Sequence, residues 1–217
     1  MDDERTLDIA VPGVGDLTGD LAVPGDARGI VLFAHGSGSS RRSPRNRDVA
    51  ARLRDRGLAT MLMDLLTPDE GRADEMDRHL RFDIGLLAER LEAVTRWLGE
   101  EPSTRALPLG LFGASTGAAA ALVAAAHLPG QVGAVVSRGG RPDLAGSALG
   151  DVEAPTLLIV GGRDDVVLDL NREALDHLGG DTRLEVVPEA THLFEEPGAL
   201  EQVADLAGAW FLQHLAG

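Results

Sequence analysis

The chain has 217 residues, with 35 acidic and 20 basic side chains, so its formal net charge is −15. So acidic a surface repels nucleic acid and anionic membranes, and we expect neither as a partner. The chain contains no cysteine, which excludes disulfides, thiolate metal sites and a cysteine nucleophile.

All basic residues are arginines, because the sequence has no lysine. Two explanations remain open for this composition. A GC-rich genome favours Arg, Ala and Gly, whereas a protein adapted to high salt tolerates acid–acid repulsion because salt screens it.

The start of the chain, MDDERTLDIA, lacks the apolar segment of a secretory signal. No apolar run reaches the ~18 residues that a membrane-spanning helix needs. No linker rich in Pro, Gly or Ser divides the chain. We therefore expect a cytoplasmic protein with a single domain over residues 1–217.

Eight short apolar segments predict β-strands. The first two flank a Gly- and Pro-rich turn and are expected to form an antiparallel hairpin. Later segments are unbroken apolar runs, as expected for strands that are buried on both faces. The expected strands are residues 7–11, 17–23, 30–34, 58–63, 107–112, 132–137, 156–160 and 184–187.

Longer segments with a helical apolar period alternate with these strands. The first helix is expected to begin at Ser43 as the cap, with Pro44 in the first turn, and to end at Gly57. Residues 67–81 are polar and acidic and predict a solvated loop. The alternation predicts an α/β fold with a mostly parallel sheet and helices on both faces. The other expected helices are residues 82–98, 116–127, 171–178 and 200–215.

The sequence Gly113-Ala-Ser115-Thr-Gly117 stands between an expected strand and an expected helix. In parallel sheets, ligands bind beyond the carboxyl ends of the strands, where this junction is expected to lie. The sequence matches G-x-S-x-G, in which a serine sits on a sharp turn that large neighbours would block. The helix N-terminus that follows favours developing negative charge. We predict that Ser115 is a nucleophile; the alternative is an ordinary junction with a capping serine.

A serine nucleophile needs a base, and the base needs an acid that orients it. Three later histidines lie near the ends of expected helices, whereas His192 lies in the loop PEATHLF after a strand. We predict His192 as the base. The segment GGRDD, after another strand, offers Asp164 or Asp165 as the acid. Further acids at calcium-loop spacing are missing from this segment, so we predict no metal site.

The loop HGSGSS, residues 35–40, resembles a phosphate cradle but lacks the G-K-[ST] ending of a P-loop. The scattered glycines of residues 13–19 lie in the expected hairpin. Neither segment therefore predicts nucleotide binding, and we expect no cofactor.

Two arginine-rich segments, residues 41–47 and 138–143, follow strands and are expected to lie at the same carboxyl edge of the sheet as the candidate site residues. Arginine can hold a carboxylate or phosphate through two hydrogen bonds, which makes Arg42 and Arg138 candidates for substrate binding. The alternative, which we favour, is that the arginines form structural pairs with Asp64, Asp83 and Asp143.

The segments HGSGSS, GASTG, GGRDD and ATHLFEEPGALE together resemble the α/β-hydrolase superfamily and, within it, the dienelactone hydrolase-like branch. The resemblance covers about residues 17–211. The stretches SPRNR, FGASTGAAAAL and VVSRGGRPDLAG resemble a group of small bacterial hydrolases, some of them fused to a phosphoribosyltransferase-like domain. Dienelactone hydrolases use a cysteine nucleophile, whereas this chain has Ser115, which looks like an ordinary esterase.

The resemblance implies which acid orients the base. Related enzymes usually read G-x-x-D-x-V at this point. Counted from Gly161, this pattern selects Asp164 over Asp165 and implies that Val166 packs beneath it.

The resemblance also implies an oxyanion hole. HG after the strand at 30–34 is the expected oxyanion loop, so the backbone N–H groups of Ser37 and Thr116 should converge on the carbonyl oxygen of the substrate. His35 is expected to hold the loop and not to act as a catalyst.

Only a short segment separates the strand at 132–137 from the strand at 156–160, which leaves no room for a lid domain. We expect an open, lidless α/β-hydrolase that cleaves small-molecule carboxylic esters through an acyl-enzyme. Two alternatives remain: a peptidase or amidase with the same residues, and a catalytically idle binding protein on this fold. The sequence does not indicate an oligomeric state.

Overall fold

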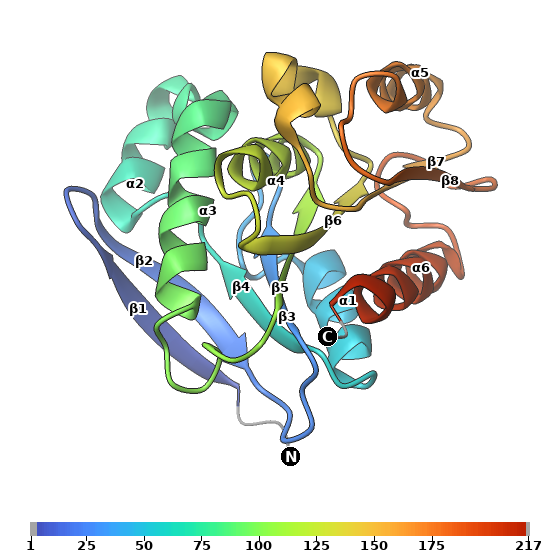
Figure 1. Cartoon of the computed structure of the whole chain (residues 1–217). Helices are drawn as coiled ribbons and strands as arrows, with labels where there is room; N and C mark the ends of the chain where they lie inside the picture. Colours follow the sequence, from blue (N-terminus) through green and yellow to red (C-terminus); the bar gives the residue numbers. More distant parts are fainter. Residues whose placement is uncertain (1–3, 216–217) are drawn as a thin grey trace.

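The computed structural model describes residues 4–215. Its strands are β1 Arg5–Val11, β2 Gly15–Ala22, β3 Ile30–Ala34, β4 Ala59–Met63, β5 Leu109–Ala114, β6 Val132–Arg138, β7 Thr156–Gly161 and β8 Thr182–Val187. They form one sheet in the order β1-β2-β4-β3-β5-β6-β7-β8 (Figure 1). The two pairs that contain β2 are antiparallel and the others are parallel. The predicted eight-stranded, mostly parallel sheet is confirmed.

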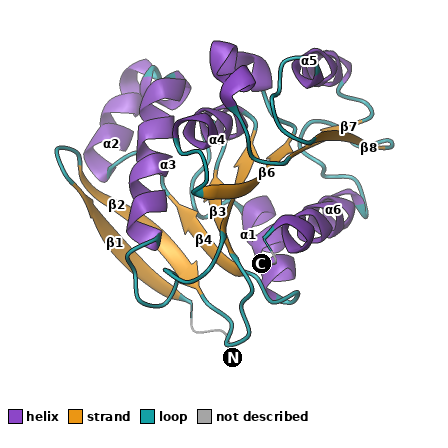
Figure 2. Ribbon diagram, in the orientation of Figure 1, coloured by secondary structure: helices purple, strands orange, loops and turns teal. Residues whose placement is uncertain are grey.

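Helices cover both faces of this sheet (Figure 2). One face carries α1 (Pro44–Arg54) and α6 (Ala199–His214), and the other carries α3 (Ile84–Leu98) and α4 (Thr116–His127). Each face has its own hydrophobic cluster. Because side chains alternate along a strand, Val135 of β6 packs towards α3 and α4, and Val136 packs towards α1 and α6.

Different segments lie at the two ends of the parallel strands. The segments with the predicted site residues follow β3, β5, β6, β7 and β8, so they meet at the carboxyl edge. Leu215, after α6, lies at the opposite edge. A Cβ atom added at Gly29, next to the start of β3, would be 3.1 Å from the Cβ atom of Leu215.

The prediction of a solvated loop over residues 67–81 is wrong. This segment forms α2 (Pro68–Asp77) and the 3-10 turn η1 (Leu80–Phe82). A capping box starts α2: the Thr67 hydroxyl accepts from Glu70 N–H at 3.2 Å, and the Glu70 carboxylate accepts from Thr67 N–H at 2.8 Å. Asp74 is the helix residue that is buried, so α2 has no apolar face that a periodic pattern would reveal.

Two helices start at other residues than expected. The helix predicted from residue 82 begins at Ile84, because Asp83 caps it by accepting from the N–H of Leu86 at 3.0 Å. The helix predicted over 171–178 is α5 (Asp165–Leu175) and begins earlier. The implied packing of Val166 beneath Asp164 is also wrong: Val166 is 73% exposed, and its neighbour Val167 is buried.

The carboxyl edge is open. Within residues 4–215, the segment between β6 and β7 contains only the 3-10 turns of η2 (Pro142–Asp151), so no lid domain covers the edge there. None of the helices in the described part of the chain has the length and apolarity that crossing a membrane requires.

Candidate active site

Ser115 occupies the turn between β5 and α4 with φ 51° and ψ −121°. Positive φ is rare for residues other than glycine and persists where the surrounding structure enforces it. Two glycines permit the turn. A Cβ at Gly113 would overlap the backbone of Ala118, and a Cβ at Gly117 would overlap the carbonyl oxygen of Ala34. This local geometry is that of a nucleophile elbow.

His192 follows β8 and is hydrogen-bonded to Asp164, which follows β7. The Nδ1 atom of His192 lies 2.7 Å from Oδ2 of Asp164. Asp164 stands at the N-cap of α5, yet its carboxylate forms no capping hydrogen bond there. When Nδ1 donates to the carboxylate, Nε2 is the nitrogen left to accept a proton. Asp165, the other candidate acid, is exposed.

Residues 138–141 lie between Ser115 and His192. The N–H of Ser115 donates to the carbonyl of Arg138 at 3.3 Å. On the other side, a Cβ added at Gly139 would be 3.5 Å from Nδ1 of His192. Nucleophile and base candidates therefore flank one short segment. Among the described residues no hydrogen bond joins Ser115 to His192; in free enzymes such bonds often tighten only when substrate binds.

The two expected oxyanion donors lie side by side. The N–H of Ser37 donates to the hydroxyl of Thr116 at 2.9 Å. Gly36 packs on the elbow, since a Cβ added there would be 3.2 Å from the Cβ of Ser115. The Thr116 hydroxyl thus occupies the N–H of Ser37, which an oxyanion would use. The sequence did not predict this contact, because only the backbone of Thr116 was expected to take part.

His35 holds the loop through its ring nitrogens. Nδ1 lies 2.9 Å from the carbonyl of Gly36, and Nε2 lies 3.2 Å from the backbone nitrogen of Leu65, which donates to it. Burial lowers the pKa of His35 below its usual 6.5. The neutral ring fits a residue that fixes the loop.

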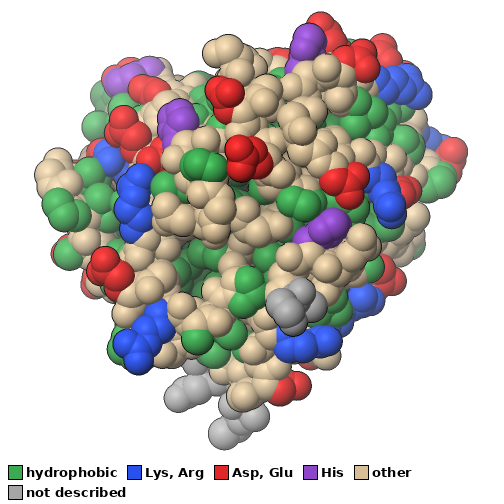
Figure 3. Space-filling model, viewed as in Figure 1, with side chains coloured by type: hydrophobic (Ala, Val, Ile, Leu, Met, Phe, Trp, Pro, Cys, Tyr) green, Lys and Arg blue, Asp and Glu red, His purple; other side chains and the backbone are tan. Residues whose placement is uncertain are grey.

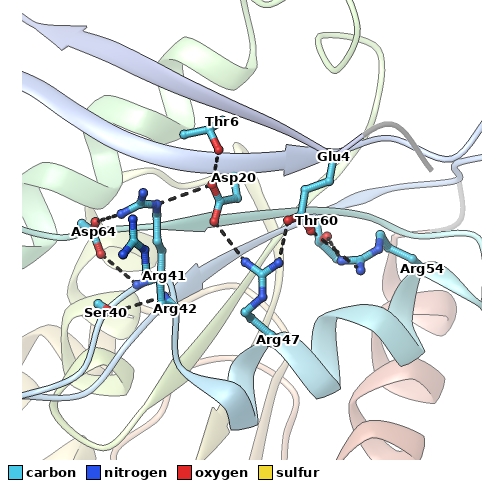
Figure 4. A network of polar contacts seen from close by, with 10 residues as sticks. All are labelled: Glu4, Thr6, Asp20, Ser40, Arg41, Arg42, Arg47, Arg54, Thr60 and Asp64. Atoms are coloured by element: carbon cyan, nitrogen blue, oxygen red, sulfur yellow. Dashed lines mark hydrogen bonds and ion pairs between the residues drawn. The ribbon is translucent and has the colours of Figure 1, made fainter.

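An ion-pair network holds the far end of the same loop (Figure 4). Arg41 donates to Asp64 through its backbone N–H at 2.8 Å and through Nη1 at 2.5 Å, and its Nε lies 3.4 Å from Asp20. Arg47 binds the other oxygen of Asp20 at 3.2 Å and Glu4 at 2.6 Å. Asp20 was missed in the sequence; the available signal was an acid between apolar residues within an expected strand.

The predicted structural pairs form in part. Arg41 pairs with Asp64, and Arg141 pairs with Asp143 at 2.7 Å. Asp83 caps α3 instead, so that pairing is wrong.

The two substrate-binding candidates differ in environment. Arg42 is exposed, and none of the described residues forms a hydrogen bond or ion pair with its side chain. Arg138 is buried.

A cavity of about 590 Å³ lies beside the oxyanion loop. Its walls are the loop itself, the segment after β4 and α2. Gly36 and Ser37 line it, so it adjoins Ser37, one of the two expected oxyanion donors. In the described part of the chain no group of three or more acidic or histidine side chains is placed to hold a metal ion.

The fold, the elbow and the open carboxyl edge define an α/β-type hydrolase. The model of the dienelactone hydrolase family matches residues 17–210, and the chain belongs to this family. A crystal structure of a dienelactone hydrolase from Anabaena variabilis is 59% identical, with a TM-score of 0.97 over 99% of both chains. Est1E from Butyrivibrio proteoclasticus shares the fold at 15% identity, with a TM-score of 0.80 over 98% of this chain and 99% of its own.

Relatives in two strains of Mycobacterium tuberculosis are 62% identical over 207 residues and carry the name of a phosphoribosyl transferase. The match covers 95% of this chain and 46% of the relatives, so the chain spans about half of their length. This name fits the expected group of hydrolases, some of which carry a phosphoribosyltransferase-like domain.

Proposed function

We propose that this chain is a serine hydrolase of small carboxylic esters. The observation that supports it best is the 2.7 Å hydrogen bond between His192 and Asp164 at the edge where the strained Ser115 lies. A carboxylate that orients an imidazole beside a serine elbow is the arrangement that acyl transfer requires.

In the proposed reaction, Nε2 of His192 takes the hydroxyl proton of Ser115 while Oγ attacks the ester carbonyl carbon. Asp164 holds the imidazole through Nδ1 and stabilises the imidazolium. The N–H groups of Ser37 and Thr116 hold the oxyanion, which requires the Thr116 hydroxyl to release Ser37. The intermediate collapses, His192 protonates the departing alcohol, and the acyl group remains on Oγ. A water molecule, deprotonated by His192, then attacks the acyl carbon; the bond to Oγ breaks, His192 returns the proton to Oγ, and the acid leaves.

The test is turnover of p-nitrophenyl acetate by wild type and by Ser115→Ala. We expect the variant to lose at least ~10³-fold in kcat, because removal of a serine nucleophile leaves only binding and oxyanion stabilisation. Ser147→Ala, an exposed serine of η2, is the matched control and should keep full activity.

A fluorophosphonate probe separates the alternatives. We expect mass spectrometry to find the adduct on Ser115 in wild type. An unlabelled protein without esterase activity would leave the idle binding protein as the better description. Faster turnover of matched amides than of esters would favour the peptidase or amidase.

A further inference from the structure

Arg138 is a buried cation that has no counter-ion in the described part of the chain. Its exposed fraction is 8%, and its Nε and Nη1 atoms are buried without a hydrogen-bond partner in residues 4–215. Burial and the charge of Arg45 lower the pKa of Arg138 to about 10. The guanidinium therefore stays charged at neutral pH, although a buried charge is costly unless it is paired.

The other buried arginine of the described chain, Arg90, has the counter-ion that a structural role requires. Arg90 is 7% exposed and donates to Glu70 at 2.8 Å. The chain carries 35 acids, so counter-ions are plentiful. Among the described residues Arg138 nevertheless has none within hydrogen-bond distance, which suits a group whose partner arrives with a ligand.

The position of Arg138 is next to the proposed nucleophile. It ends β6, its register partner is Ala114, and its carbonyl accepts from the N–H of Ser115. Ala134 and Val136 of the same strand pack towards α1 and α6. Because side chains alternate, Arg138 points to that face as well, towards Arg45 in the first turn of α1.

Arg45 adds a second cation to the same place. Its Nη1 binds Glu195 at 3.0 Å, and its Nε is buried without a partner in the described structure. The Glu195 side chain is 65% exposed, so solvent weakens its hold on Arg45. The N-terminal turn of α1 further favours negative charge there.

We propose that Arg138, assisted by Arg45, is an anion-binding subsite of the active site, so that the preferred ester carries a carboxylate or a phosphate. This inference rests on the proposed esterase function. An arginine side chain that starts beside Ser115 places the bound anion within the length of one small substrate. A planar guanidinium holds either oxyanion through two hydrogen bonds.

The kinetic test compares a neutral ester, p-nitrophenyl acetate, with p-nitrophenyl hemisuccinate and with the p-nitrophenyl ester of phosphonoacetic acid. Wild type should show a lower KM for at least one anionic ester, and the lower of the two identifies carboxylate or phosphate. Arg138→Gln should raise that KM ~30-fold, as expected when a buried charge pair loses one partner. Its KM for p-nitrophenyl acetate should stay within about twofold.

Matched variants make the test specific. Arg138→Lys keeps the charge and should recover part of the affinity, whereas Arg172→Gln, an exposed arginine of α5, should change neither KM. Equal effects of Arg138→Gln on neutral and anionic esters would overturn the subsite while the esterase stands. Absence of turnover and of Ser115 labelling would instead overturn the proposed function.

A stability measurement shows whether Arg138 binds a ligand or stabilises the fold. Arg138→Met should leave the melting temperature unchanged or raise it, because it removes an unpaired buried charge. Arg90→Met should lower it, because Glu70 then loses its cationic partner. A fall for Arg138→Met as large as that for Arg90→Met would overturn the proposal. Calorimetry on Ser115→Ala should find succinate or inorganic phosphate bound, and should find neither bound after Arg138→Gln is added.

Discussion

Through His35, the stability of the folded protein depends on pH. Burial lowers the pKa of its ring below the usual 6.5, so the unfolded chain takes up this proton at a higher pH than the folded protein does. The stability that comes from the neutral ring is therefore complete above the unfolded pKa, about 6.5. It is lost as pH falls from there towards the lower folded pKa.

We expect the melting temperature of the protein to fall between about pH 7.5 and about pH 5. His35→Gln has no titrating ring and should fall less steeply over this range. His177→Gln, which removes an exposed histidine, should follow wild type. Parallel curves for wild type and His35→Gln would contradict this role for His35.

At the residue scale, the sequence predicted candidate site residues better than their contacts. Ser115, His192 and Asp164 were predicted because each follows a strand within a short motif, and Asp164 was preferred to Asp165 through the family resemblance. The hydrogen bond from Ser37 to the hydroxyl of Thr116 joins two loops, and no local pattern encodes it. The isolation of Arg138 could not be read either, because a missing counter-ion is a property of packing.

At the scale of elements, α2 shows how a cap can form a helix that lacks an apolar face. Thr67 supplies one half of its capping box, and the helix forms a wall of the cavity beside the oxyanion loop. Thr67→Ala should destabilise the protein by about 1 kcal/mol, which lowers the melting temperature by about 2–4 °C.

Thr67→Ser is the control for this change, because it keeps the hydroxyl that accepts from Glu70. It should recover most of the lost stability. If serine and alanine proved equally destabilising, the capping hydrogen bond would not be the cause.

The elements with a strong apolar signal were predicted well. All eight strands and the helices α1, α3, α4 and α6 appear near their expected positions, because burial imposes a period on their sequences. The failures are α2, whose acids leave no apolar period, and the first turns of α5. The segment of α2 is helical through its cap and its neighbours, which an apolar pattern does not report.

For the whole molecule, the net charge of −15 means that many carboxylates have no cation to pair with. Acidic and basic side chains are interspersed on the face shown in Figure 3, so local pairs form while an overall repulsion remains. Exposed pairs contribute little each, and the repulsion among the excess acids acts over a longer range.

We therefore expect the melting temperature to rise by a few degrees as KCl is raised and the Debye length falls from ~30 Å to ~3 Å. Sucrose at matched water activity does not screen charges, so it should add only its general stabilising effect. A flat salt profile would contradict the repulsion and favour genome bias as the source of the composition.

The position of Leu215 against Gly29 has a practical consequence. An affinity handle or a fluorescent reporter attached at this edge of the sheet lies on the side remote from the loops of the proposed site. The protein can therefore be anchored to a support through this edge while substrates keep unobstructed entry to the open carboxyl edge.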